Sequence, residues 1–500
     1  MIGMHDYVTL SHCWGTMETL KLMKSNVQAL SSTIPLHSLC KTFQDAVLVT
    51  SLLGYKYLWI DSMCIIQDDE DDWRKESALM SEVYGNAVVN LAATDAKDGS
   101  VGLFHQRVVA RITKQYVQTK SLQTYEIPDE RLYFRCLDRS LLSRRAWVFQ
   151  ERYLARRTVH FSAEQIFCEC RSHIVCEGWP EGASVGADGP DDIPFPSKSN
   201  MGNPEEWRKI VQLYSRARLT YSKDKLVALS GVARQFQSVT GDQYVAGLWR
   251  TGLEVYLCWR VERSKTQHPI PQPETSSYQA PSWSWASTNQ PIHWYLYTVP
   301  LRNRFDNDNL HRLISFLDIQ LVPLGPDPLG QLQAAHLEID CGPLIRGNVI
   351  ASLLNGSKLS FDNSHQRNLK SGKPFRMRAE GVVQSDLEIQ FERVAESLYL
   401  LPISIDTSGD RDLHDQTWAR MYGLVVTKAG CDRLGVFRRF GAWEINFNVG
   451  SYSELIELFL MRPETLMDDT LYGKKFETDE DGIPRYAITL VYGVWSSDGI

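Results

Sequence analysis

Residues 57–73, with the sequence YLWIDSMCIIQDDEDDW, decide how the amino-terminal part of the chain is expected to fold. The apolar run 57–60 ends abruptly at Asp61, and Cys64 and Gln67 follow before five consecutive acids. A continuously apolar run of this length is typical of a strand covered on both faces, as in a parallel sheet. Ligands of such sheets bind beyond the carboxyl ends of the strands, so Asp61, Cys64 and Gln67 are candidates for a functional site. In the structural alternative, Asp61 caps a turn and Cys64 packs in the core.

The segments on either side of this stretch predict two further strands. One ends in the cluster Ser11-His12-Cys13-Trp14-Gly15, and the other ends at Thr94-Asp95. Crossovers between parallel strands are right-handed, so all three strand ends should open on the same edge of one α/β sheet. The five acids suit the start of a helix, because they complement its dipole. The expected strands are 7–10, 57–60 and 88–93, and the expected helices are 42–53 and 73–84.

Composition and charge narrow the class of protein. At roughly 150 residues per domain, a chain of 500 residues is expected to form two to four domains. Hydrophobic residues at 43% and charged residues at 23% are typical of globular proteins. A net charge of -7, with acids and bases interspersed, argues against nucleic acid or an anionic membrane surface as the main partner.

The same sequence predicts a cytoplasmic protein without a membrane span. The apolar runs are much shorter than the roughly 20 residues that a bilayer requires. We expect no secretory signal, because the first residues do not place a basic segment before an apolar one. Ten cysteines scattered over such a chain favour free thiols in a reducing compartment.

The rest of the chain divides by composition. A hairpin is expected over 157–170, and Asn203 followed by proline and two acids predicts a helix start. Later helices are expected from Lys223 and from Ala246, and residues 282–287 alternate Ser and Trp as a strand would. The predicted domains are 1–177, a loop or linker at 178–203, a helical segment at 204–262 and a β-rich region at 263–500.

Residues 143–152, which are rich in charged and aromatic side chains, supply another candidate catalytic residue. As a helix, this segment places Trp147 and Glu151 on one face, next to Arg144 and Arg145. Glu151 is a candidate catalytic carboxylate if it faces the expected crevice at the sheet edge. The alternative is a buried ion pair between Glu151 and Arg144, Arg145 or Arg152.

Three other site types receive less support. No Gly-rich phosphate loop of either common spacing is present, so a nucleotide triphosphatase and a Rossmann dehydrogenase are not supported. The adjacent His12 and Cys13 suggest a thiol nucleophile, but neighbours at a strand end point to opposite faces, so Asp61 or Cys64 would have to complete it. Zinc ligation is not expected, because the spacing of the four candidate ligands departs from paired CxxC motifs. Those ligands are Cys168, Cys170, His173 and Cys176.

Three blocks of sequence, taken in order, resemble the fungal heterokaryon-incompatibility (HET) domain. They are YVTLSHCWG at 7–15, YLWIDSMCIIQ at 57–67 and RAWVFQE at 145–151. The resemblance implies a part in fungal non-self recognition, in which the domain triggers growth arrest or cell death. It also implies a distant similarity to the Toll/interleukin-receptor domain, a flavodoxin-like module of which some members cleave NAD with a Glu in a Ser-x-Trp-x3-Glu setting. Ser143 and Glu151 are similar in type, with a longer interval between Ser and Trp.

These observations define the expected fold. We predict a flavodoxin-like or Toll/interleukin-receptor-like parallel α/β sheet in the HET domain, then a helical segment and a β-rich α+β carboxyl-terminal region. The first functional hypothesis is a HET effector whose carboxyl-terminal region regulates it, binds a protein partner or self-associates.

Two alternatives to this hypothesis stay open. The chain is a small-molecule enzyme, either an NAD glycohydrolase or a secondary-metabolite biosynthetic enzyme, or it is a non-enzymatic assembly module. No cofactor is assigned, and NAD enters only as a substrate. The candidate catalytic residues are Glu151, Asp61, His12, Cys13 and Cys64. The candidate substrate-binding residues are Ser11, Trp14, Gln67, Trp147, Arg144 and Arg145.

Overall fold

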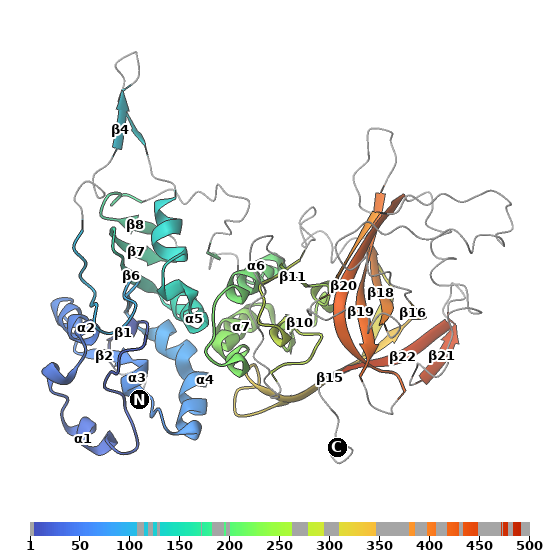
Figure 1. Ribbon diagram of the computed structural model, residues 1–500, viewed down its shortest axis with the longest axis horizontal. Coiled ribbons are helices and arrows are strands. Elements are labelled where there is room, and N and C mark those ends of the chain that lie inside the picture. Colours follow the sequence, from blue (N-terminus) through green and yellow to red (C-terminus); the bar gives the residue numbers. More distant parts are fainter. Residues whose placement is uncertain are drawn as a thin grey trace. The chain divides into compact units, whose positions relative to one another are not determined.

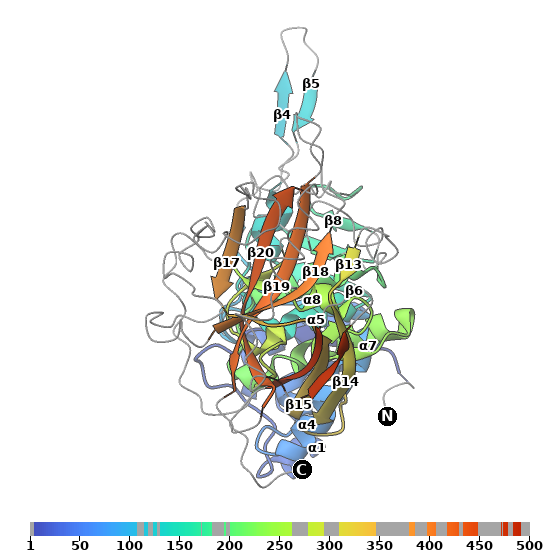
Figure 2. The same ribbon diagram turned by 90° about the vertical axis from the view of Figure 1, so that its right-hand side faces the viewer.

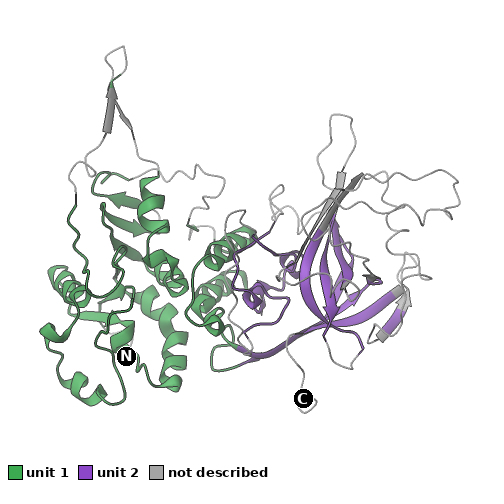
Figure 3. Ribbon diagram, in the orientation of Figure 1, with its two compact units in different colours: residues 1–241, 324–331 green, residues 242–323, 332–500 purple. Residues whose placement is uncertain are grey.

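A computed structural model gives the fold of the chain (Figure 1). The chain forms two compact units, of which unit 1 comprises residues 1–241 and 324–331 and unit 2 comprises 242–323 and 332–500 (Figure 3). Most of the predicted linker 178–203 lies outside the described residues. The structure describes residues 5–107, 115–118, 124–127, 131–171, 173–182, 195–196, 201–262, 279–294, 310–346, 380–385, 398–406, 418–429, 434–448, 472, 474–478 and 484–491.

Unit 1 contains a six-stranded, mostly parallel sheet in the order β2-β1-β3-β6-β7-β8. The first four strands of this order are parallel, and the last two add as an antiparallel hairpin extension. The predicted α/β class, the three predicted strands and the hairpin are therefore confirmed. The strands are β1 (Tyr7–Ser11), β2 (Tyr57–Ile60), β3 (Val89–Ala92), β6 (Arg157–Phe161), β7 (Ile166–Cys170) and β8 (Ile174–Cys176).

Strand β2 is covered on both faces, as predicted, although it lies at the edge of the sheet and pairs only with β1. Leu58 and Ile60 pack in the cluster that contains Phe43 of α2, and Trp59 packs edge to face on Tyr84 from the other side. Tyr57 at its start is 49% exposed. An apolar run shows that a strand contacts other parts of the chain, but it does not show on how many sides the strand has neighbours.

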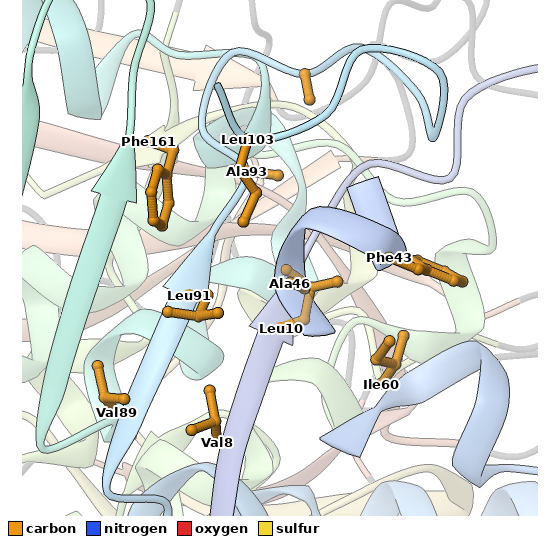
Figure 4. Packing of buried hydrophobic residues seen from close by; sticks show 11 residues of the cluster. Val8, Leu10, Phe43, Ala46, Ile60, Val89, Leu91, Ala93, Leu103 and Phe161 are labelled. Atoms are coloured by element: carbon orange, nitrogen blue, oxygen red, sulfur yellow. The ribbon is translucent and has the colours of Figure 1, made fainter. Parts of the chain in front are cut away.

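The alternation of β1 separates an apolar face from a polar one. Val8 and Leu10 pack against Phe43 and Ala46 of helix α2 (Lys41–Leu52), together with residues of β2 and β3 (Figure 4). Because successive side chains of a strand point to opposite faces, Thr9 and Ser11 lie on the other face. That face is covered by helices α4 (Glu70–Asn86) and α5 (Ala146–Leu154).

The two helix starts predicted from acids are confirmed. At the start of α4, the side chain of Asp69 accepts hydrogen bonds from the backbone N–H groups of Asp71 and Asp72. At the start of α6 (Pro204–Ser215), the Asn203 side chain accepts one from the N–H of Glu205. Side-chain oxygens at these positions satisfy backbone donors that a helix start would leave unpaired. The run of acids is therefore a helix start.

The helix predicted from Ala246 is wrong. Strands β9 (Tyr244–Val245) and β10 (Leu248–Trp249) form a tight hairpin there, and only α8 (Leu253–Tyr256) is helical. Ala246 and Gly247 both have positive φ, 48° and 91°, as the two central residues of a type I′ turn require. The turn geometry overrides the helical spacing of the apolar residues.

The strand predicted at 282–287 is also wrong. This segment forms a turn followed by a 3₁₀ helix over Trp285–Ser287. The Ser284 hydroxyl accepts a hydrogen bond from the N–H of Ala286 and donates one to the Ala246 carbonyl. The alternation of Ser and Trp thus reflects buried indoles and local serine caps instead of a pleated strand.

Unit 2 is β-rich, as predicted, with a ten-stranded, largely antiparallel sheet (Figure 2). Strands β14, β18 and β19 all lie in the region 263–500 that was predicted to be β-rich. None of the helices that the structure describes is long and apolar enough to span a membrane. Strands β11 (Arg260–Val261) and β12 (Ile292–His293) form a separate two-stranded sheet. The ten strands of the large sheet are β13 (Leu310–Arg312), β14 (Ile314–Pro323), β15 (Leu332–Cys341), β16 (Ile345–Arg346), β17 (Glu380–Ser385), β18 (Leu398–Asp406), β19 (Trp418–Lys428), β20 (Val436–Asn448), β21 (Lys474–Thr478) and β22 (Pro484–Val491).

The remaining elements of unit 1 complete its described part. Helix α7 packs against both α4 and α5, so the helices that follow the sheet in sequence belong to the same compact unit. These elements are α1 (Val27–Ser32), η1 (Leu36–Ser38), α3 (Asp61–Cys64), β4 (Gln115–Gln118), β5 (Thr124–Ile127), η3 (Phe134–Asp138), η4 (Leu142–Arg144), η6 (Ser222–Asp224) and α7 (Val227–Thr240).

Candidate functional site

A chain of buried hydrogen bonds leads from the centre of the sheet to Glu151. The Thr9 hydroxyl donates to Asn90 Oδ1 at 3.1 Å, and Asn90 Nδ2 donates to Ser11 Oγ at 3.1 Å. The Ser11 hydroxyl has a single proton, which it donates to Glu151 Oε2 at 2.5 Å. The Tyr84 hydroxyl of α4 lies near the same carboxyl group and donates a hydrogen bond to the Leu10 carbonyl oxygen at 3.4 Å. We call Thr9, Ser11, Tyr84, Asn90 and Glu151 the inner cluster.

The carboxyl group of the inner cluster is partly neutral near pH 7. Burial raises the pKa of Glu151 from 4.5 to about 7, and the charge of Asp61 contributes in the same direction. The charge of Arg145, the hydrogen bond from Ser11 and the nearby Tyr84 hydroxyl act against this shift. The free-energy cost of removing the charged carboxylate from water exceeds the stabilisation that these neighbours give it, so the pKa rises. A carboxyl group that titrates near neutral pH can both donate and accept a proton.

A second group of polar side chains lies beside the inner cluster, nearer the surface. Asp61 Oδ2 accepts a hydrogen bond from Trp14 Nε1 at 3.0 Å, and Asp61 Oδ1 lies 3.8 Å from His12 Nδ1. Arg145 donates a hydrogen bond to the His12 carbonyl oxygen. The Asp61 side chain is 20% exposed, whereas that of His12 is 5% exposed. We call His12, Trp14, Asp61 and Arg145 the outer cluster.

The environment of His12 favours the uncharged imidazole. Burial lowers the pKa of His12, and the charge of Arg145 lowers it further, while Asp61 opposes the shift. The ring packs edge to face on Phe43, with 5.0 Å between the ring centroids. His12 is thus anchored in the apolar core on one side and faces Asp61 on the other.

The structure brings together six of the predicted site residues and places the others elsewhere. Cys13 is half-buried against an apolar cluster that includes Val148, and burial raises the pKa of its thiol, so a thiolate is disfavoured. Cys64 is exposed. Their roles as catalytic thiols stay predictions. The six residues that come together are Ser11, His12, Trp14, Asp61, Arg145 and Glu151.

Two of the other predicted substrate-binding residues, Gln67 and Trp147, have side-chain partners within the fold. Gln67 Nε2 donates to the carbonyl oxygens of Asp61 and Ile65, at 3.3 and 2.8 Å, and so closes the turn after β2. Trp147 packs edge to face on Trp73 of α4, with 6.3 Å between the ring centroids. Arg144 is exposed. None of these placements tests a role in binding.

The serine that contacts Glu151 is Ser11, 140 residues upstream. Ser143, which the resemblance to NAD-cleaving domains suggested, has its hydroxyl hydrogen-bonded to that of Ser140 at 3.1 Å. Parallel pairing of β1 with β3 and the packing of α5 on their polar face create the Ser11 contact. Spacing within one segment of sequence could not have revealed it.

Sequence reasoning missed Thr9, Tyr84 and Asn90. One feature of the sequence could have pointed to them. Asn90 lies in the middle of the apolar run Val-Val-Asn-Leu-Ala-Ala, at a position that a strand buries. Asn90 is 1% exposed, and a buried amide requires hydrogen-bonding partners. Thr9 and Ser11 occupy alternate positions of β1 and lie on the same face as Asn90, which makes them the natural partners.

Arg152 follows Glu151 in sequence but belongs to a different group of residues. Its guanidinium contacts Glu169 Oε2 at 2.7 Å and Asp138 Oδ1 at 2.8 Å, and it donates a further hydrogen bond to the Tyr133 hydroxyl. His160 Nε2 lies 2.9 Å from Glu169 Oε2. Of the three arginines considered as ion-pair partners of Glu151, Arg152 instead pairs with Glu169 and Asp138. We call Tyr133, Asp138, Arg152, His160 and Glu169 the Arg152 cluster.

The cysteine-rich segment of β7 and β8 was a weak zinc candidate. Cys168 and Cys170 lie on the same face of β7, and every cysteine that the structure describes is a free thiol. Within the described residues, no group of three or more His, Cys, Asp or Glu side chains has the geometry to hold a metal ion.

Unit 1 is thus an α/β domain in which polar side chains from β1, β3, α4 and α5 gather on one face of a parallel sheet. Residues 7–151 match the family model of the heterokaryon incompatibility protein (HET). Residues 7–151 of the chain are therefore a HET domain. Neither the curated proteins nor the solved structures contain a match to the chain. Helices α6 and α7 and all of unit 2 follow the matched residues.

Proposed function

We propose that this protein acts in fungal heterokaryon incompatibility, where its HET domain triggers growth arrest or cell death in the cytoplasm. The observation that carries the proposal is the family match over residues 7–151, which includes every member of the inner and outer clusters. The order of the four parallel strands, β2-β1-β3-β6, also agrees with the start of the flavodoxin-like order. This agreement supports a Toll/interleukin-receptor-like module.

Inducible expression in a fungal host tests this proposal. We expect growth arrest with the full chain and its loss with Glu151→Gln, which keeps the shape of the side chain but cannot ionise. The matched control is Glu70→Gln, because the Glu70 side chain is 65% exposed at the start of α4. Normal growth with abundant protein, both for the wild type and for variants in which the packing of α5 is loosened, would overturn the proposal. Growth arrest that persists with Glu151→Gln, together with a change in oligomeric size, would favour the assembly module.

A second candidate, NAD glycohydrolase activity, is favoured by the hydrogen bond from Ser11 to Glu151. In this reaction the bond between ribose and nicotinamide breaks, water adds to the ribose carbon, and the products are ADP-ribose, nicotinamide and a proton. The ionised Glu151 would stabilise the positive charge that develops on the ribose in the transition state. The shifted pKa of Glu151, about 7, would let it accept the proton of the attacking water near neutral pH.

Nicotinamide release from NAD, followed by chromatography, tests the second candidate. We expect turnover by the purified full chain and a loss of at least about 100-fold with Glu151→Gln, the usual size of a general-base contribution. Glu70→Gln should retain full turnover. Absence of turnover in a folded preparation that still arrests growth in cells would remove the hydrolase and leave the first proposal intact.

A further inference from the structure

We infer that the connection 324–331, acting through helix α7, is an autoinhibitory latch that holds α5 over the inner cluster. This inference rests on the proposed function, because it concerns access to Glu151. The latch consists of residues 324–331, Arg234 of α7 and the contacts of α7 with α4 and α5. Every part of it other than α4 and α5 lies outside the residues that match the HET family.

The starting point is that the inner cluster is closed. Glu151 is 4% exposed and Ser11 is 1% exposed, so a ligand cannot contact either group in this arrangement. Glu151 projects from α5, while Ser11 belongs to the central strand of the sheet. A substrate or partner can therefore reach them only if α5 moves relative to the sheet.

Helix α7 restrains α5 through close contact. The backbone N–H of Gly231 donates to Gln150 Oε1 at 3.3 Å, one residue before Glu151. A Cβ atom at Gly231 would lie 2.6 Å from Ser81 Cβ of α4 and 3.0 Å from Leu154 Cδ1 of α5. Only a glycine allows the three helices to approach this closely.

Arg234 joins α7 both to α4 and to the connection 324–331. One guanidinium nitrogen, Nη1, donates to the Ala78 carbonyl and the Ser81 hydroxyl of α4, at 3.2 and 3.0 Å. The other, Nη2, donates to Asp327 Oδ1 at 2.8 Å. The Asp327 side chain is 9% exposed, so the ion pair is largely shielded on the carboxylate side. A charge-assisted hydrogen bond of this kind is stronger than one between neutral groups.

The connection 324–331 is itself ordered around this contact. Asp327 Oδ1 also accepts a hydrogen bond from the N–H of Leu329, and Gln331 Nε2 donates to the Lys223 carbonyl at 3.3 Å. Leu329 is 5% exposed. These residues belong to unit 1, although the chain inserts them between strands β14 and β15 of unit 2 (Figure 3).

The position of residues 324–331 between β14 and β15 allows the carboxyl-terminal region to act on the latch. Because residues 324–331 are covalently continuous with β14 and β15, a partner that binds or distorts this hairpin would displace Asp327 from Arg234. Loss of the ion pair would leave α7 held on α4 and α5 by fewer contacts, and α5 could then shift far enough to admit a ligand beside Ser11 and Glu151. The site would open in response to an event in the carboxyl-terminal region.

Asp327→Asn in the full chain is the direct test, because it removes the charge and keeps the shape. We expect amide hydrogen exchange in α7 and α5 to accelerate about tenfold, the size expected for the loss of one charged hydrogen bond. Growth arrest and nicotinamide release should increase together with exchange. The matched control is Asp340→Asn, which removes the charge of the Asp340–Arg485 pair on β15, where Asp340 Oδ1 lies 3.0 Å from Arg485 Nε, and should change neither exchange nor activity.

Gly231→Ala loosens the contact of α7 with α4 and α5 without changing Asp327. The melting temperature of this variant shows whether it folds. Unchanged exchange in α5 with Asp327→Asn, or faster exchange accompanied by lower activity, would overturn the latch. If no variant and no wild-type protein arrests growth or releases nicotinamide, the proposed function fails. Faster exchange in Asp327→Asn would still support a latch on α5 in that case.

Discussion

Adjacent residues of one helix, Glu151 and Arg152, belong to two buried polar groups with opposite electrostatic character. In the Arg152 cluster, burial alone would raise the pKa of Glu169, but Arg152 and His160 outweigh it and hold that pKa well below its ordinary value. In the inner cluster, burial outweighs the charge of Arg145 and raises the pKa of Glu151 to about 7. In the Arg152 cluster the Glu169 carboxylate keeps its charge beside the Arg152 guanidinium, whereas the inner cluster contains a carboxyl group that titrates near neutral pH.

This difference separates a structural role from a chemical one. A buried carboxylate with direct ion partners keeps its charge over the physiological range and fixes the elements around it. A buried carboxyl group held mainly by hydroxyl groups changes its charge in that range, which is the property that proton transfer requires. We therefore infer that Arg152 anchors α5 and that Glu151 is the candidate for proton transfer.

The largest expected effect is on stability and falls on the Arg152 cluster. Glu169→Ala removes a carboxylate that contacts both Arg152 and His160, and it leaves a buried guanidinium with fewer partners. We expect the free energy of unfolding to fall by about 3 to 5 kcal/mol, as for other broken buried ion pairs. Denaturant titration at pH 7 measures this value. A loss below about 1 kcal/mol would show that the network does not anchor α5.

The next effect is the pH dependence contributed by Glu151. Its folded-state pKa, about 7, lies above the ordinary value of 4.5, so the native state binds the additional proton between these two values. The contribution of Glu151 to the free energy of unfolding is fully present when the pH is below the ordinary pKa of 4.5. This contribution falls by about 3 kcal/mol as the pH rises through the folded-state pKa. Glu151→Gln should remove this fall. Denaturant titrations at several pH values should therefore show the variant gaining stability relative to the wild type as pH increases.

Identical pH dependence in Glu151→Gln and wild type would contradict the shifted pKa. Glu70→Gln serves as the control, because its exposed carboxylate should leave the difference between the two curves unchanged.

A smaller effect is expected from Ser11→Ala. The Ser11 hydroxyl donates to Glu151 and thereby favours the ionised carboxylate. Its removal should raise the pKa of Glu151 by about one unit, the equivalent of one hydrogen bond. Titration of Glu151 by carbon-detected NMR measures the shift directly. A pKa that falls in Ser11→Ala would mean that the hydroxyl does not donate to this carboxyl group.

The smallest effect is expected from an ion pair near the surface. Arg135 and Glu164 form two nitrogen–oxygen contacts of 3.0 Å, but the arginine side chain is 47% exposed. We expect Glu164→Gln to change the free energy of unfolding by less than about 1 kcal/mol, because water competes with such pairs. Thermal melts in low and high salt measure it. A loss in the free energy of unfolding as large as that expected for Glu169→Ala would show that burial does not determine how much each ion pair stabilises the fold.

Much of the amino-terminal fold was predictable, because its signals are local. Apolar runs ending in polar residues predicted β1, β2 and β3, and Asn203 followed by proline predicted the start of α6. The prediction failed where local spacing competed with backbone geometry. At Ala246 the apolar spacing indicated a helix, but two consecutive residues with positive φ form a hairpin turn. The HET resemblance, carried by three short blocks, was confirmed by the family match.

The candidate site was predictable as a place but not as a set of contacts. The sequence alone determined that Ser11, Asp61 and Glu151 close apolar or aromatic segments, and the parallel order brings such ends to one edge. Only the tertiary structure decided that Ser11 contacts Glu151, that Asn90 and Tyr84 join them, and that Arg152 faces Glu169. These choices depend on which face of α5 meets the sheet, and that is set by packing between elements far apart in the chain.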